Sequence, residues 1–298
     1  MKQLSIVIVT YKSEQDIYEC LKSIWQYCDI PKEELEVIIV DNSPECEPMF
    51  SKLKELYGDD IVLIHNTHNG GYGQGNNIGI RQAQAPVIMI MNPDVRMMQP
   101  VFKRTTEAFA SNPQMSIYGM QQMLSPTLKS RNSFICTDRI NGYIGTLLNA
   151  FCSRLNWYIP RYMFFSGSCF FLRKDMFRTI GMYDEQLFMY GEEADIHYRM
   201  SKRFGREMKF NPALRYIHLT KERELTLNTL QKILQSCIRQ NEKNGQTRQK
   251  TLLHRWQSNR VLLLMEWIKT KIFKKESHLY DVLSAYGKYL KEEMRKPQ

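Results

Sequence analysis

The residue best placed to do chemistry is Asp94, which ends the stretch Pro86-Val-Ile-Met-Ile-Met-Asn-Pro-Asp. Val87 to Met91 is too short for a helix and apolar without alternation, which predicts a central strand covered on both faces. Pro93 lacks an N–H and fixes φ, so it ends the strand and holds the acid at the rim. Ligands bind outside the carboxyl ends of strands in open α/β sheets. We therefore expect Asp94 to face a ligand, the alternative being a polar turn after a strand.

Other predicted strands bring polar residues to the same edge. Three apolar, β-branched runs predict strands at residues 4–11, 35–43 and 61–66. The first ends in Thr10 and Tyr11 and the second in Asp41 and Asn42. Helical patterns between the strands indicate parallel crossover connections, so these four residues should lie near Asp94.

Two local patterns govern the helices between these strands. Ser13 with Asp16 three residues later predicts a capping box that opens the first helix. The stretch Asn69-Gly-Gly-Tyr-Gly-Gln-Gly-Asn-Asn-Ile-Gly79 is rich enough in glycine for its backbone to approach a ligand at a helix start. It is neither a P-loop nor a dinucleotide fingerprint, and an ordinary loop is the alternative.

Together these motifs resemble family 2 glycosyltransferases. The matching segments are Thr10-Tyr11, Val40-Asp-Asn-Ser43, Asn69-Gly70 with Gly75-Asn-Asn-Ile-Gly79, and Asn92-Pro-Asp94. The Asn-Pro-Asp form is similar to a rhamnosyltransferase-like branch. The resemblance assigns donor binding to Thr10, Tyr11, Asp41, Asn42, Asn69, Gly70, Gly71, Gly75, Asn76, Asn92 and Asp94.

The resemblance continues on the acceptor side and covers about residues 3 to 220. Phe165-Ser-Gly-Ser-Cys-Phe-Phe-Leu-Arg173 looks like the acceptor-side strand, with Ser166, Gly167 and Ser168 near the acceptor. Phe188-Met-Tyr-Gly-Glu-Glu-Ala-Asp195 is close to the family's Phe-x-Tyr-x-Glu-Asp-x-Asp motif, with Glu-Glu in place of Glu-Asp. His218-Leu-Thr-Lys221 departs from the usual His-x-x-Gly-x-Ser after the histidine.

The implied reaction is an inverting transfer from a nucleotide-diphospho-sugar to an acceptor hydroxyl. The diphosphate leaving group needs a divalent cation, and hard cations take oxygen ligands, so Asp94 suits Mg²⁺ or Mn²⁺. His218 is a candidate second ligand that would favour Mn²⁺; otherwise it is a strand-end histidine making one hydrogen bond. Asp41 would accept a hydrogen bond from the imide N–H of uracil or thymine, although guanine carries a similar group. Arg81 would face the diphosphate or sugar, or else be a solvated helix-surface residue.

A general base must lie across the site from the leaving group. The resemblance gives this role to Glu193, with Glu192 as the second candidate, if a helix begins at these residues. Asp195 belongs to the acceptor-side set, and its spacing to Arg199 predicts an ion pair on the helix surface. The alternative is that all three acids only cap and solvate a helix start.

Composition limits the class of protein. The chain of 298 residues is 43% hydrophobic, has no apolar run long enough to span a membrane and begins directly with a strand, which predicts a cytoplasmic protein. Seven scattered cysteines suggest neither a disulfide framework nor a zinc site. The net charge of +10 is concentrated: residues 199–275 hold 19 Lys or Arg against 5 acids, which predicts an anionic partner.

The C-terminal extension, residues 226–298, is helical in pattern and mixes Trp256 and Trp267 with aliphatic and basic residues up to Lys275. This composition is typical of a helix lying at an anionic membrane surface. The alternatives are helices packed on the catalytic domain with a solvated basic face, or helices that mediate homo-oligomerisation. Nucleic acid is not expected as a partner, because no recognised binding module is present.

The sequence thus predicts a GT-A, Rossmann-like α/β fold: a mixed, mainly parallel sheet flanked by helices, with a helical C-terminal extension. We expect a nucleotide-binding half at 1–95, an acceptor-side half at 96–225 and the extension at 226–298. The predicted activity transfers a dTDP- or UDP-linked sugar to a saccharide, free or lipid-linked, in bacterial surface polysaccharide synthesis. A non-catalytic adaptor of the same fold at the membrane and a nucleotidyltransferase are the alternatives.

Overall fold

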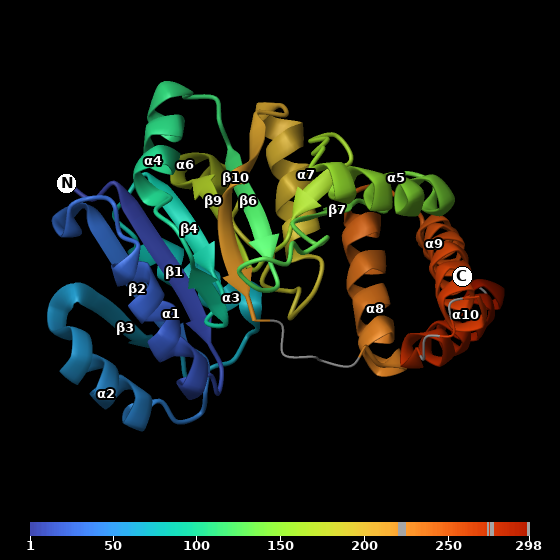
Figure 1. The fold of residues 1–298 in the computed structure, drawn as a ribbon, viewed down its shortest axis with the longest axis horizontal. Coiled ribbons are helices and arrows are strands. Elements are labelled where there is room, and N and C mark those ends of the chain that lie inside the picture. Colours follow the sequence, from blue (N-terminus) through green and yellow to red (C-terminus); the bar gives the residue numbers. More distant parts are fainter. Residues whose placement is uncertain (220–224, 273, 275–276, 297–298) are drawn as a thin grey trace. The chain divides into compact units, whose positions relative to one another are not determined.

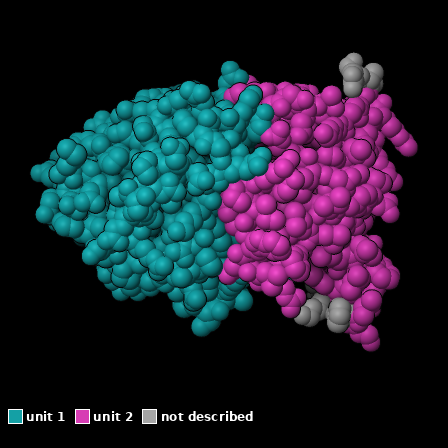
Figure 2. Space-filling view, turned by 90° about the horizontal axis from the view of Figure 1, so that it is seen from above, with its two compact units in different colours: residues 1–134, 165–220 teal, residues 135–164, 221–298 magenta. Residues whose placement is uncertain are grey.

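A computed structural model describes residues 1–219, 225–272, 274 and 277–296. The chain divides into two compact units, coloured separately in Figure 2: residues 1–134 with 165–220, and residues 135–164 with 221–298. Lys221 and Lys275, which end two of the segments discussed above, lie outside the described residues.

The first unit is built on an eight-stranded sheet in the order β3-β2-β1-β4-β9-β6-β10-β5 (Figure 1). The strands are β1 (Leu4–Thr10), β2 (Leu35–Asp41), β3 (Ile61–His65), β4 (Val87–Met91), β5 (Val95–Met97), β6 (Ile117–Met123), β9 (Cys169–Arg173) and β10 (Met208–His218). The helices of this unit are α1 (Glu14–Gln26), α2 (Glu47–Tyr57), α3 (Tyr72–Gln82), α4 (Phe102–Ser111), α6 (Lys174–Thr179) and α7 (Glu192–Phe204). Short 3₁₀ turns, η1 (Lys32–Glu34) and η2 (Gly58–Asp60), precede β2 and β3.

The strands predicted from the sequence form the centre of this sheet. β1 pairs in parallel with both β2 and β4, and β2 pairs in parallel with β3. Every residue of β2 and β4 is buried, as expected for strands covered on both faces. β9 runs antiparallel to β4 and β6, so the sheet is mixed and mainly parallel, as predicted. The carboxyl ends of β1, β2 and β4 therefore share one edge.

The first helix begins where the sequence predicts, but the predicted capping box does not form. Ser13 is the N-cap residue of α1, yet its hydroxyl bonds to the backbone of Tyr11 and makes no cap hydrogen bond. The predicted apolar face is confirmed, because Ile17, Leu21 and Ile24 are all fully buried. Burial of this face therefore stabilises the helix without the cap.

The second unit is helical. Its helices are α5 (Gly142–Leu155), α8 (Leu227–Lys243), α9 (Arg248–Lys271) and α10 (His278–Arg295). The strands β7 (Phe134–Cys136) and β8 (Met163–Phe165) pair in a two-stranded sheet where the chain passes between the units. The helical pattern predicted for 226–298 is confirmed. This unit includes residues 135–164 as well as 221–298. The expected boundary at 225 and the expected halves 1–95 and 96–225 stay predictions.

The charge asymmetry follows this division. The second unit contains 20 Lys and Arg against 9 Asp and Glu, a net charge of +11, whereas the first contains 21 against 22. All seven cysteines are free thiols. Within the described ranges, no helix has both the length and the hydropathy required to cross a membrane.

Candidate active site

The metal-ligand candidates Asp94 and His218 meet at the carboxyl edge of the first unit's sheet. His218 ends β10, where it pairs with Val95, and Leu219 N donates to Asp94 O at 2.9 Å. This pairing brings His218 Nε2 within 3.2 Å of Asp94 Oδ1. Both side chains keep some exposure, 15% for His218 and 27% for Asp94. A ligand can therefore reach an oxygen and a nitrogen donor side by side.

One further atom makes this edge a suitable cation site. Asn92 Oδ1, two residues before Asp94, is buried, and within the described part of the chain it has no hydrogen-bond partner. A buried polar atom without a partner is costly, so such atoms often mark a site that a ligand completes. The combination of carboxylate, amide oxygen and imidazole fits Mg²⁺ or Mn²⁺, with the imidazole favouring Mn²⁺.

A second cluster of ligand-type groups fits a metal less well. Asp41, Cys46 and His65 lie with one donor atom each within 4.8 Å of one another. However, Asp41 Oδ1 already accepts hydrogen bonds from Thr10 Oγ1 at 2.7 Å and Ser43 Oγ at 3.0 Å. His65 Nε2 lies 2.9 Å from the carbonyl oxygen of Ser43. These contacts indicate an internal hydrogen-bonding cluster.

The predicted base-binding residues lie together at the ends of β1 and β2. Thr10 and Asp41 are paired in register and buried, with Asp41 only 1% exposed. Asp41 Oδ2 accepts from Ser43 N at 3.3 Å. Tyr11, the next residue, is 49% exposed and stands beside this buried pair. The role of Asp41 in contacting a nucleobase stays a prediction.

The glycines of the predicted ligand loop have a packing role in α3. A Cβ on Gly75 would lie 2.7 Å from Val9 Cγ1, and one on Gly79 would lie 2.5 Å from Val7 Cγ1. Asn76 is fully buried and its Nδ2 donates to Tyr72 O at 2.9 Å. The lack of side chains at Gly75 and Gly79 therefore lets α3 approach β1 closely. Contacts of Gly75 and Asn76 with a sugar donor stay predictions.

The turn before α3 is held by its own amides. Gly71 has φ of +92°, a conformation that favours glycine, and is the N-cap of the helix. Asn69 Oδ1 accepts from Gly71 N at 3.1 Å, and Gly70 N donates to Gln74 Oε1 at 2.8 Å. Asn42 Nδ2 donates to Gly71 O at 3.2 Å, which ties the turn to the end of β2. The four predicted donor-side residues 42, 69, 70 and 71 are thus brought together.

The acceptor-side residues 166–168 lie next to the Asn-Pro-Asp turn. Asn92 N donates to Ser168 O at 2.9 Å, which fixes the end of β4 against the start of β9. Ser168 Oγ lies 2.9 Å from Tyr216 Oη and 3.2 Å from Ser166 Oγ. Ser168 is 2% exposed, so its buried side chain supports the Asn-Pro-Asp turn from inside the protein.

The two candidate bases begin α7, which meets the condition set for their role. Glu193 lies against the backbone of Gly167, because a Cβ at that glycine would collide with Glu193 Oε1. Tyr72 Oη donates to Gly167 O at 2.7 Å, and its ring packs edge-on against Tyr183 at 6.1 Å. The Glu193 carboxylate therefore stands beside the loop that Asn92 anchors.

The pKa values of the two glutamates are both raised. Burial, followed by the charge of Glu193, raises the pKa of Glu192 to about 9, and Glu192 is 2% exposed. Burial also raises the pKa of Glu193 above its usual value. Glu192 therefore holds a proton at neutral pH. Glu193, which is more exposed, is the better placed of the two to exchange a proton with a ligand.

The predicted pair of Asp195 and Arg199 forms, but it is largely buried and does not lie on the helix surface as expected. Arg199 Nε donates to Asp195 Oδ2 at 2.8 Å, and Asp195 is 1% exposed. Arg199 also donates to Ile180 O at 2.6 Å and to Met182 O at 2.7 Å. This network ties α7 to the preceding loop, so the contacts of Asp195 are structural, and its acceptor-side role stays a prediction.

Arg81 belongs to the surface. It forms an exposed ion pair with Glu185 at 2.5 Å. Because it occupies the last turn of α3, which returns from the carboxyl ends of the strands, it lies away from Asp94. Arg81 is therefore the solvated helix-surface residue given above as the alternative to a diphosphate or sugar contact.

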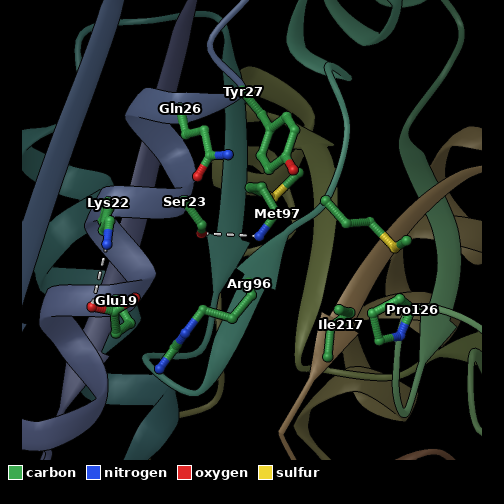
Figure 3. A pocket seen from close by; sticks show the side chains of 10 residues that line it. Glu19, Lys22, Ser23, Gln26, Tyr27, Arg96, Met97, Pro126 and Ile217 are labelled. Atoms are coloured by element: carbon green, nitrogen blue, oxygen red, sulfur yellow. Dashed lines mark hydrogen bonds and ion pairs between the residues drawn. The ribbon is translucent and has the colours of Figure 1, made fainter.

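A pocket of about 370 Å³ is lined by residues of α1 and β5 together with Pro126 and Ile217 (Figure 3). Its lining includes Lys22, Ser23 and Arg96, and none of the predicted site residues. Ser23 Oγ accepts from Met97 N at 3.0 Å, and Arg96 Nη1 donates to Pro93 O at 2.9 Å. The first of these hydrogen bonds ties β5 to α1, and the second holds the Asn-Pro-Asp turn against β5.

Sequence patterns missed several residues that support the site. Tyr72 and Tyr216 hold the acceptor loop, and Asn77 joins α3 to the loop before α7 through Tyr183 N and O, both at 3.0 Å. Buried His197 accepts from Phe165 N at 3.1 Å, and burial lowers its pKa to about 3, so the ring is neutral. These residues touch partners far away in the chain, and no local pattern marks them.

Solved structures with a similar fold are glycosyltransferases of the GT-A fold. The Pyrobaculum calidifontis mannosyltransferase PcManGT, solved with GDP-Man and Mn²⁺, has a TM-score of 0.59 at 15% identity, covering 97% of this chain and 80% of that one. Staphylococcus aureus TarS has a TM-score of 0.56 at 15% identity, covering 91% of this chain and 46% of that one. The predicted fold class is therefore confirmed.

Sequence comparison identifies the family. The model described as Glycosyl transferase family 2 matches residues 5–181, more than half of the chain. The chain belongs to glycosyl transferase family 2.

Two curated relatives are glycosyltransferases. The Haloferax volcanii low-salt glycan biosynthesis hexosyltransferase Agl10 is 29% identical over 211 residues, 67% of this chain. The S. aureus (strain Mu50) poly(ribitol-phosphate) β-N-acetylglucosaminyltransferase TarS is 30% identical over 97 residues, 32% of this chain. The matches span 62% of Agl10 and 16% of TarS.

Proposed function

We propose that this protein is an inverting glycosyltransferase that moves a sugar from a dTDP- or UDP-sugar to a hydroxyl of a saccharide, free or lipid-linked. The observation that carries the proposal is the arrangement at one edge of the sheet. Asp94 and His218 offer donor atoms 3.2 Å apart, and the backbone of Asn92 is bonded to the Ser166–Ser168 loop against which Glu193 lies.

On the donor side, Asp94 and His218 would hold Mg²⁺ or Mn²⁺, with Asn92 Oδ1 nearby as a third candidate ligand. A divalent cation bound there neutralises charge that develops on the leaving diphosphate. In this proposal, Thr10, Asp41 and the turn at Asn69–Gly71 form the side of the site that takes the nucleoside. Hydrogen bonding within this turn keeps its backbone in place before the donor arrives.

On the acceptor side, Glu193 takes the proton of the attacking hydroxyl. The new bond joins the acceptor oxygen to the anomeric carbon as the bond from that carbon to the phosphate oxygen breaks. The nucleoside diphosphate leaves with the electron pair, and the proton remains on Glu193. A raised pKa makes Glu193 a stronger base than an exposed glutamate, and the protonated Glu192 adds no second charge beside it.

The relatives support this class of donor and acceptor. The TarS structures include complexes with UDP and UDP-GlcNAc, and the PcManGT structure contains GDP-Man and Mn²⁺. Agl10 is a hexosyltransferase of glycan biosynthesis, and TarS is a poly(ribitol-phosphate) β-N-acetylglucosaminyltransferase. By this analogy, we assign the chain to bacterial surface polysaccharide synthesis, working at the cytoplasmic face of the membrane where a lipid-linked acceptor would be found.

The basic C-terminal extension fits a location beside an anionic membrane. Trp267 is 42% exposed and available for such contact. Trp256 is instead packed against the core of the second unit, with Arg260 over its ring at 5.1 Å, so it stabilises the helices themselves.

A thermal-shift panel tests the donor. Unfolding temperature would be measured with UDP-, dTDP-, GDP- and CDP-sugars, each with and without Mn²⁺. Specific binding at a hundred times Kd stabilises by about 2.7 kcal/mol, so a UDP- or dTDP-sugar should raise Tm only when the metal is present. Equal shifts with all four sugars, or none with any, would contradict the proposed donor.

A further inference from the structure

Helix α5 of the second unit exposes a continuous apolar face. Ile144, Leu147, Phe151 and Leu155 are 63%, 56%, 54% and 57% exposed. At 100° per residue these four positions fall within about 80° of one another, so they form a single stripe, here called the α5 stripe. Trp157, 58% exposed, follows directly after the helix. Apolar side chains gathered in this way mark a contact surface more often than scattered ones do.

The opposite face of the helix is fixed within its own unit. Gly142 is buried against α9, where a Cβ would collide with the carbonyl oxygen of His254, and Gly142 N donates to Gln257 Oε1 at 3.0 Å. Asn141 caps the helix by accepting from Tyr143 N at 3.0 Å. Since α5 packs against α9 through this side, the stripe is presented outward by a well-anchored helix.

The chain segment that contains the stripe carries charge of one sign. Arg139, Arg154 and Arg161 are exposed, and the sequence contains no Asp or Glu from residue 139 to residue 174. Asp138, just before this range, is bonded to Arg255 at 2.7 Å. The unit as a whole has a net charge of +11. An apolar stripe with an arginine rim matches an apolar layer beneath anionic head groups.

We propose that the α5 stripe inserts into the surface of an anionic lipid bilayer. The aliphatic residues and Phe151 would enter the boundary of the acyl region, Trp157 would lie at head-group level, and the arginines would face lipid phosphates. A second copy of the chain is a poorer occupant. A two-fold interface through this face would bring the arginine rims of two +11 units together.

This proposal goes beyond the proposed function, because it names a second surface, outside the 226–298 extension, and does not depend on glycosyl transfer. The test uses the full-length chain and sedimentation with vesicles of phosphatidylcholine alone or mixed with phosphatidylglycerol. The key variant is the triple change Ile144→Gln, Leu147→Gln and Phe151→Gln. Leu56→Gln is the matched control, since Leu56 is 55% exposed on α2 in the first unit.

We expect the wild-type chain and the Leu56→Gln control to bind the phosphatidylglycerol vesicles and the triple variant to bind far less. Moving about half of a Leu-sized side chain out of water is worth roughly fivefold in affinity, so three changes predict a fall of about a hundredfold. A second variant, Arg154→Gln with Arg161→Gln, should lose binding to the anionic vesicles while the low affinity for pure phosphatidylcholine is unchanged.

Unfolding temperature of each variant shows whether the fold is kept, and sedimentation equilibrium reports self-association. Vesicle binding that is equal in the wild type and in the folded triple variant would overturn the proposal. So would a wild-type chain that ignores both vesicles, or one that forms a dimer which the triple variant abolishes. Failure of donor binding in the thermal-shift panel would leave these results unaffected.

Discussion

Exchanging Glu193 and Glu192 separately for Gln distinguishes their roles. Glu193→Gln keeps the side-chain size against Gly167 but removes the proton acceptor. A general base typically contributes about 10²- to 10⁴-fold, so kcat should fall by that factor while donor binding survives. Glu192→Gln replaces a carboxyl that is already protonated at neutral pH by a neutral group of the same shape, so kcat should stay near normal.

The same pair gives a stability prediction with a defined sign. The pKa of Glu192 is about 9 in the folded chain against 4.5 in the ordinary case, so the folded state binds more protons between these values. This group's contribution to stability is therefore present below pH 4.5 and lost as pH rises toward 9, at a rate of at most about 1.4 kcal/mol per pH unit. Glu192→Gln should remove that loss, so its Tm advantage over the wild type should grow with pH.

The assays are single-turnover kinetics with a saturating nucleotide-sugar and thermal unfolding from pH 5.5 to 8.5, on both variants. Wild-type kcat should rise with pH as Glu193 loses its proton, with a midpoint above the ordinary value of 4.5. A Glu193→Gln enzyme with near-normal turnover, beside a folded but inactive Glu192→Gln enzyme, would refute the assignment of Glu193 as the general base. It would indicate Glu192 in that role instead. A pH-independent Tm difference would refute the protonated state of Glu192.

Three further substitutions test the rest of the site. Asp94→Asn should abolish the Mn²⁺-dependent part of nucleotide-sugar binding, measured by calorimetry; unchanged affinity with Mn²⁺ would contradict the ligand role. Asp41→Asn should weaken UDP binding by about ten- to a hundredfold if the carboxylate accepts the imide N–H, because a charge-assisted hydrogen bond is worth about 1.5 to 3 kcal/mol; an unchanged Kd would assign Asp41 to structure alone. Gly79→Ala should lower the free energy of unfolding in urea by about 1 to 3 kcal/mol, because the added Cβ would overlap buried Val7. No loss would mean that α3 can move away from β1.

The sequence by itself determined the central strands and what stands at their ends. Val87 to Met91 forms a fully buried strand because a short run of apolar residues can bury both faces only in the middle of a covered sheet. Pro93 ends this strand because it lacks an N–H and fixes φ, and Asp94 therefore stands at the strand's carboxyl end. The helix start at Glu192 and the pairing of Asp195 with Arg199 were also predictable, because both depend on contacts within a few residues.

Only the tertiary structure decided what depends on distant partners. His218 meets Asp94 because β10 pairs with β5, a register that no local pattern encodes. The glycines of α3 look like a ligand loop in the sequence, yet Gly79 is required by the approach of the helix to Val7.

The second unit shows the same limit. Residues 135–164 are far in the sequence from the rest of their unit, and their helix α5 joins α9 across more than a hundred residues of chain through Gly142 and Gln257. Hydrophobic periodicity reveals that a face is apolar, but the packing of the remaining elements decides whether that face is buried in the core or, like the α5 stripe, left at the surface.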